Sequence, residues 1–161
     1  MVYDPLEEAR VHYHIVETPS MCQAATPILE KLSEDFPKIS VFVHDSFPQA
    51  LQNPLIVNIK GTIQYIIDYK ETLSKVSQLN PLFIIVSNTP MTRSQTYARM
   101  QLNMPFRKLA QWVFCYAEFI AFITGLGYRL IYIENHKQDH SQIGMPKGVD
   151  TQVVSLVFAR K

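Results

Sequence analysis

Length, composition and charge exclude several classes of protein before any motif is considered. The chain has 161 residues, 47% of them hydrophobic and 18% charged, with 15 Lys and Arg against 14 Asp and Glu. A chain of this size can bury one substantial core, and its hydrophobic content argues against disorder. A net charge of +1 lacks the excess of positive charge that is typical of nucleic-acid-binding domains. We therefore expect one globular domain over residues 1–161, with no nucleic-acid partner.

The N-terminus and the cysteines favour a cytoplasmic protein. No basic and apolar leader of the signal-peptide type opens the sequence. Cys22 and Cys115 stand far apart and without the spacing of metal ligands, so no metal site is expected. Residues 109–126 are nearly continuous in hydrophobic residues, but Glu118 within them would be costly in lipid. This stretch predicts a buried or dimer-forming helix rather than a membrane span.

Short apolar runs alternate with segments of helical periodicity along the chain. In order, we predict a strand at 13–17, a helix at 21–36, strands at 39–43 and 55–59, a helical stretch at 63–67, a helix at 69–79, a strand at 82–86, a polar stretch at 91–104, a long helix from about 107 to 126, and strands at 128–133 and 153–159. Pro27 should cause a kink or a late start in the first helix.

The order of these elements predicts the fold class. Repeated strand–helix–strand units with continuous apolar strands indicate an α/β fold with a mostly parallel sheet, covered by helices on both faces. No helix separates the final two strands, so the last strand should run antiparallel to its neighbour.

Ligands of open α/β sheets bind at the carboxyl ends of the strands, and these ends are therefore the first candidates for a site. They comprise Glu17, Asp45, residues 60–65 and residues 87–89. A carboxylate that ends a strand suits a ribose diol, because it can accept hydrogen bonds from two neighbouring hydroxyls. Asp45 could accept from an exocyclic amine in the same way. The structural alternative is that Glu17 and Asp45 only cap the helices that follow them.

Several short stretches, taken in order, resemble a known family. They are 14–19 (His-Ile-Val-Glu-Thr-Pro), 61–66, 85–90, 125–130, 134–136 and 155–158. Their order and spacing from residue 13 to residue 161 resemble a class I S-adenosylmethionine-dependent methyltransferase. The chain is most similar to a family of methyltransferases that are often encoded with polysaccharide-biosynthesis genes. The resemblance implies a Rossmann-like three-layer fold, S-adenosylmethionine as cofactor, and methyl transfer to a saccharide-type or other small acceptor.

The same resemblance implies roles for particular residues. Glu17 would hold the cofactor ribose, Asp45 and Ser46 would flank adenine, and the stretch from Asn58 to Tyr65 would line the methionine side and the acceptor. The residues expected to contact the cofactor are Glu17, Thr18, Asp45, Ser46, Asn58, Gly61 and Gln64.

Two residues are candidates for catalysis. His136 can act as a general base for an acceptor hydroxyl, because the pKa of histidine lies near working pH. Its Gly, Pro and polar neighbours place it in a loop with His140, where solvated histidines are the alternative to any functional role. Tyr65 is the second candidate, either as a catalytic residue or as one that orients the acceptor. The alternative is that its side chain only packs in the fold.

One part of the family's pattern has no counterpart in this sequence. Such enzymes begin with a first strand and a glycine-rich loop that approaches the cofactor, whereas the first of the five glycines here is Gly61. We therefore expect a truncated or altered sheet without its usual first strand, weak cofactor binding and self-association, with a homodimer as one form. The alternative function is a non-catalytic remnant or interaction subunit. An open polar cleft near Glu17 would favour the enzyme, and a closed apolar pocket would favour the remnant.

Overall fold

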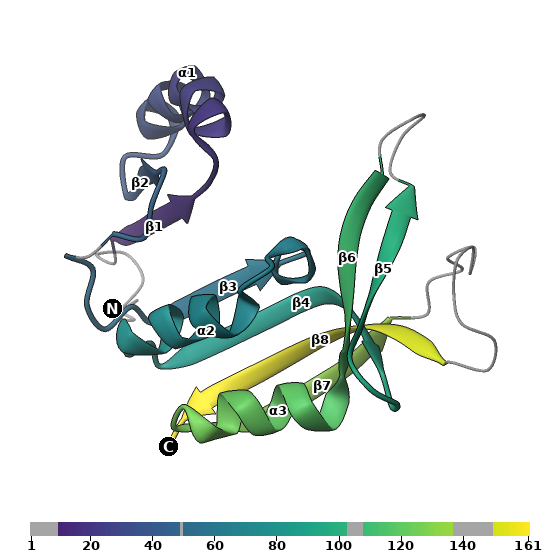
Figure 1. Ribbon diagram of the computed structural model, residues 1–161. Helices are drawn as coiled ribbons and strands as arrows, with labels where there is room; N and C mark the ends of the chain where they lie inside the picture. Colours follow the sequence, from purple (N-terminus) through teal and green to yellow (C-terminus); the bar gives the residue numbers. More distant parts are fainter. Residues whose placement is uncertain (1–9, 49, 103–107, 137–149) are drawn as a thin grey trace. The chain divides into compact units, whose positions relative to one another are not determined.

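The computed structural model describes residues 10–48, 50–102, 108–136 and 150–161 (Figure 1). The chain divides into two compact units, Met1–Ala50 and Leu51–Lys161. Each unit contains a sheet of its own, with two strands in the first and six in the second.

The first unit is one strand–helix–strand motif. Strand β1 (Val11–Val16) is followed by helix α1 (Pro19–Asp35) and strand β2 (Ile39–His44), and the two strands pair in parallel. Helix α1 starts at Pro19, where a missing N–H costs nothing, and continues through Pro27. The late start predicted at Pro27 is therefore wrong. None of the described residues of this unit is buried.

The second unit is built on a mixed sheet. Its elements are β3 (Ile56–Lys60), the 3-10 helix η1 (Ile63–Tyr65), α2 (Tyr69–Gln78), β4 (Phe83–Thr92), β5 (Tyr97–Leu102), β6 (Lys108–Cys115), α3 (Tyr116–Gly125), β7 (Tyr128–His136) and β8 (Thr151–Arg160). The strand order is β5-β6-β4-β8-β7, with β3 also paired to β4. Strand β4 runs parallel to β3 and β6, whereas the pairs β4–β8, β7–β8 and β5–β6 are antiparallel. The antiparallel last strand is thus confirmed, but the mostly parallel sheet is wrong, because the hairpin and the final strands make this sheet largely antiparallel.

The long apolar helix predicted from about residue 107 to 126 is also wrong. The segment forms strand β6 and then helix α3, which begins directly after Cys115. Both halves are apolar, but for different reasons: Val113 and Phe114 are buried within the sheet, and Phe119 is buried on one side of the helix. In the part of the chain that the structure describes, no helix is long and apolar enough to cross a membrane.

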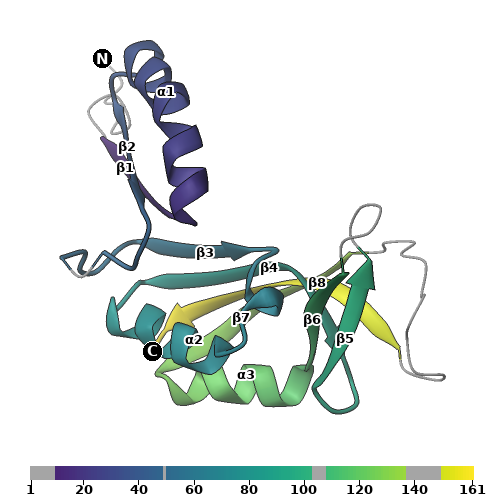
Figure 2. The ribbon, with the colours of Figure 1, turned by 45° about the horizontal axis from the view of Figure 1, so that its top comes forward.

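The core of the second unit lies between the sheet and two helices on one face (Figure 2). The ring of Tyr69 in α2 lies 4.7 Å from that of Phe114 in β6 and 6.4 Å from that of Phe119 in α3, measured between centroids. Ile84 and Phe158 are paired across β4 and β8 and are fully buried. Helices on both faces were predicted, but α2 and α3 share one face because their aromatic side chains pack against each other.

Candidate functional site

An open hollow of about 560 Å³ borders the carboxyl end of β2 in the first unit. Its walls come from the start of α1, the last two residues of β2 and the segment that follows β2. They are formed by Pro19, Cys22, Val43, His44, Asp45, Ser46, Phe47 and Pro48. Asp45 and Ser46 are exposed, and the Ser46 hydroxyl donates to Asp45 Oδ1 at 3.2 Å. The hollow therefore presents a carboxylate and a hydroxyl beside the apolar ring of Phe47.

Glu17 and Thr18 lie at the neighbouring strand end. The Glu17 N–H donates to the His44 carbonyl at 2.9 Å, which extends the β1–β2 ladder by one residue. The Thr18 N–H donates to Glu17 Oε2 at 3.3 Å, and Thr18 is the N-cap residue of α1. The Glu17 side chain therefore contacts the N-cap residue of α1, which agrees with the alternative that Glu17 only caps this helix. No helix follows Asp45 before β3 among the described residues, so capping does not account for that residue.

A histidine pair lies beside this strand end. His14 Nδ1 and His44 Nε2 are 3.0 Å apart, and the ring of Phe42 stacks on that of His14 with centroids 4.9 Å apart. Desolvation, followed by the nearby His44 and His12, holds the pKa of His14 below its usual value. One ring therefore donates to the other in the uncharged form. This pair was missed from the sequence, although His14 and His44 close to two strand ends are a visible signal.

In the second unit, two predicted site residues, Gly61 and Gln64, contact residues of β4 just after the end of β3. Gly61 has a φ of 62°, its N–H donates to the Ser87 carbonyl at 2.9 Å, and a Cβ atom there would lie 3.2 Å from Asn88 Nδ2. Gln64 is only 3% exposed, and its Nε2 donates to the Asn88 carbonyl at 3.3 Å. Its Oε1 is buried and has no hydrogen-bond partner. Asn58 lies earlier in β3 and is exposed.

Tyr65 joins η1 to the β5–β6 hairpin. Its hydroxyl donates to Gln101 Oε1 at 2.7 Å and accepts from Gln111 Nε2 at 3.4 Å. Arg99 Nε donates to Gln111 Oε1 at 2.8 Å. These contacts of Gln101, Gln111 and Arg99 were not predicted, because the hairpin was interpreted as a polar stretch and part of a helix.

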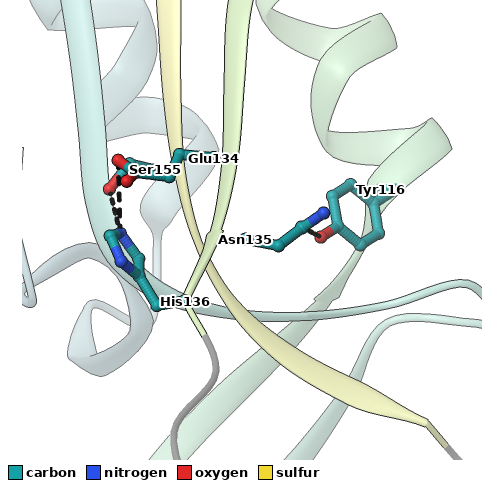
Figure 3. Close-up of polar contacts among 5 residues, drawn as sticks. All are labelled: Tyr116, Glu134, Asn135, His136 and Ser155. Atoms are coloured by element: carbon teal, nitrogen blue, oxygen red, sulfur yellow. Dashed lines mark hydrogen bonds and ion pairs between the residues drawn. The ribbon is translucent and has the colours of Figure 1, made fainter.

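His136 ends strand β7 and does not lie in a loop, so that prediction is wrong. Its Nε2 is 2.8 Å from Ser155 Oγ on β8 and 3.9 Å from Glu134 Oε2 (Figure 3). Both partners meet the same ring nitrogen. An acid in a Ser–His–acid triad must contact the other nitrogen, so this cluster lacks that arrangement. His140 lies outside the described residues.

The described residues contain no group of three or more His, Cys, Asp and Glu side chains that could hold a metal ion.

Comparison with known proteins shows which solved structures have a similar fold. No protein-family model and no curated protein matches the sequence. A SAM-dependent methyltransferase from Methanosarcina mazei has a similar structure, with a TM-score of 0.62 over 94% of this chain and 82% of that chain, at 7% identity. The glycopeptide N-methyltransferase MtfA in complex with S-adenosylmethionine gives a TM-score of 0.61 over 94% of this chain and 78% of that chain, at 12% identity. The chain has a methyltransferase-like α/β fold.

This methyltransferase-like fold is shared by enzymes of another kind. A pericyclic reaction enzyme matches with a TM-score of 0.55 at 14% identity, over 94% of this chain and 36% of that chain. The chain therefore spans about a third of that enzyme. Because one fold hosts different reactions, the function must be argued from the sites.

Several strands, β1 and β3 among them, have one edge without a partner strand among the described residues. Strand β1 pairs only with β2, and β3 pairs only with β4. Both strands carry exposed apolar side chains, including Tyr13 in β1 and Ile56 in β3.

Proposed function

We propose that the chain binds S-adenosylmethionine and transfers its methyl group to an oxygen or nitrogen of a small acceptor. The observation that carries this proposal is the open hollow with Asp45 and Ser46 at the end of β2, the strand that pairs with β1 and ends beside it. A closed apolar pocket there would have favoured a non-catalytic remnant. The complex of MtfA with S-adenosylmethionine supports the choice of cofactor.

Each predicted site residue has a role in this proposal. The Glu17 carboxylate accepts hydrogen bonds from the ribose hydroxyls, with Thr18 beside it. Asp45 accepts from the adenine amine, and Ser46 contributes its hydroxyl to the same hollow. Asn58, Gly61 and Gln64 line the part of the site where the methionine side of the cofactor and the acceptor meet.

The protein must align the acceptor with the methyl group and remove a proton from the acceptor. When bound, the cofactor supplies the methyl group that is transferred. The chain's residues hold the acceptor in line with that group, which lowers the entropic cost of the reaction. His136 Nε2 can take the acceptor proton as a general base, and Tyr65 orients the acceptor. A saccharide-type acceptor, in cytoplasmic polysaccharide biosynthesis, is the class that the resembling sequence stretches favour.

We further propose that the unpaired edges of β1 and β3 reflect the absence of the first strand that the family resemblance implies. Exposed strand edges recruit another chain, so the protein should self-associate, with a homodimer as the simplest form. Without the glycine-rich loop, cofactor binding should be weak, at about −5 to −6 kcal/mol. A monomer that binds the cofactor at low micromolar concentration would contradict this part of the proposal.

Titration calorimetry with S-adenosylhomocysteine tests the proposed cofactor site. Glu17→Ala should weaken binding by about 1.5–3 kcal/mol, the value of a hydrogen bond to a charged group. Glu30→Ala removes another exposed carboxylate, from α1, and should leave affinity unchanged. Equal affinities for wild type and Glu17→Ala would remove Glu17 from the site.

A further inference from the structure

We infer that the small hollow between η1 and the β5–β6 hairpin binds the N–H or O–H end of the methyl acceptor, with Gln64 Oε1 as the hydrogen-bond acceptor. The hollow has a volume of about 80 Å³ and is lined by residues of these elements and by Ile67, which follows η1. The identity of this hollow as the methyl-acceptor site rests on the proposed function. The preference of the hollow for a hydrogen-bond donor is independent of that function.

The buried side chain of Gln64 carries the inference. Its Nε2 donates to the Asn88 carbonyl, which can only accept, so the amide nitrogen must point towards Asn88. This contact fixes the orientation of the amide and leaves Oε1 without a partner, although Gln64 lines the hollow and is 3% exposed. A buried acceptor without a donor is costly and calls for a specific explanation. A ligand that donates a hydrogen bond supplies one.

Two other polar side chains of the hollow, those of Tyr65 and Gln111, are already engaged. The Tyr65 hydroxyl contacts both Gln101 and Gln111, and Gln111 Oε1 accepts from Arg99. These contacts hold the hairpin wall in place. Among the described buried side-chain atoms, Gln64 Oε1 is the one without a partner. The hollow therefore needs a donor from its ligand.

The remaining walls define the rest of the ligand. Trp112, Ala98 and Ala110 line the hollow, and no charged side chain is among its lining residues. Burial against such walls disfavours a charged group. The volume admits only a few non-hydrogen atoms. We conclude that the site takes an uncharged N–H or O–H group together with a small, flat carbon framework.

Two isosteric probes can test this preference without the cofactor. Pyrrole has a ring N–H, whereas furan has the same five-membered ring and no donor. Each is titrated into the full-length protein and followed by the NMR signals of Trp112 and Gln64. Pyrrole should bind about fivefold more tightly than furan, the effect of one ordinary hydrogen bond. Gln64→Met should remove this preference, and the control Gln52→Met, in an exposed residue, should keep it.

Several results would overturn the inference. They are equal affinities of the two probes for wild type, a preference that persists in Gln64→Met, and no binding of either probe at tens of millimolar, as expected if the hollow holds only water. If Gln64→Met does not fold, Ala98→Leu decides the question, since it fills the hollow and should abolish binding of both probes. Failure of S-adenosylhomocysteine to bind would refute the proposed function while leaving the pyrrole preference intact.

Discussion

The two units contain the same local motif in very different surroundings. Strands β1 and β2 are parallel and connected by α1, and strands β3 and β4 are parallel and connected by α2. In the second unit β4 pairs with β3, β6 and β8, and every buried hydrophobic residue of the described chain lies in this unit. In the described part of the first unit, β1 and β2 pair only with each other (Figure 1).

This difference predicts that the first unit is the less stable of the two, because no further strands and few apolar contacts support its motif. A parallel pair normally has both faces covered, and a sheet of two strands is marginal in water. Strand β1 nevertheless presents Val11, Tyr13 and Ile15 with at least 40% exposure each. The first unit thus holds the proposed adenosine site but not the apolar burial that would fix it.

The largest expected effect comes from removing one phenylalanine from each unit. Phe158 is fully buried in β8, whereas Phe42 in β2 is 43% exposed. Phe158→Ala should lower the free energy of unfolding by about 3–5 kcal/mol, because it removes a core side chain and leaves a cavity. The matched variant Phe42→Ala should cost less than about 1 kcal/mol. Urea denaturation measures both values, and similar losses would mean that the first unit has a core of comparable strength.

A smaller effect is expected at the end of β3. Gly61 has a positive φ, and a Cβ there would press against Asn88. Gly61→Ala should therefore destabilise the protein by about 1–2 kcal/mol. Gly125→Ala is the matched control, because a Cβ at Gly125 meets nothing within 4 Å. Thermal unfolding at one protein concentration compares the two, and a neutral Gly61→Ala would show that this turn relaxes without strain.

The smallest expected effect is a dependence of the first unit on pH. The pKa of His14 is lowered in the folded chain, so folding favours its uncharged form. Its contribution to stability is fully present above the unfolded pKa of about 6.5 and is lost as the pH falls from there towards the lowered pKa. The protection factors of amides in β1 and β2, which correct the exchange rates for the intrinsic effect of pH, should therefore fall between pH 7 and pH 5. In His14→Phe this loss of protection should be smaller, and an unchanged pH dependence would assign it to other groups.

Local sequence patterns predicted much of the fold, because most strands and helices can be recognised from a few consecutive residues. The apolar runs at 39–43, 55–59 and 82–86 lie within or overlap β2, β3 and β4. Residues 109–126 could not be assigned in this way, since a buried strand followed by a buried helix looks like one long apolar segment. Strand β6 is defined by its pairing with β5, which depends on contacts between separate segments.

The same distinction applies to the sites. Glu17 and Asp45 were predicted to share a sheet edge from the rule that parallel strands end together, and they follow paired residues of β1 and β2. Gln111 and Arg99 were missed because their role depends on the hairpin. The buried Gln64 Oε1 without a hydrogen-bond partner could not be predicted either, since the burial of one amide oxygen follows from tertiary packing alone.

Hydrogen exchange with and without S-adenosylhomocysteine most directly tests whether the cofactor site lies on the unit without a core. Without ligand, amides of β1 and β2 should exchange much faster than those of β4 and β8, because few buried contacts protect them. Saturating S-adenosylhomocysteine should then slow exchange around Glu17 and Asp45 and leave β8 unchanged. Equal protection of both units without ligand, or no slowing around Glu17 and Asp45 at saturation, would contradict this assignment.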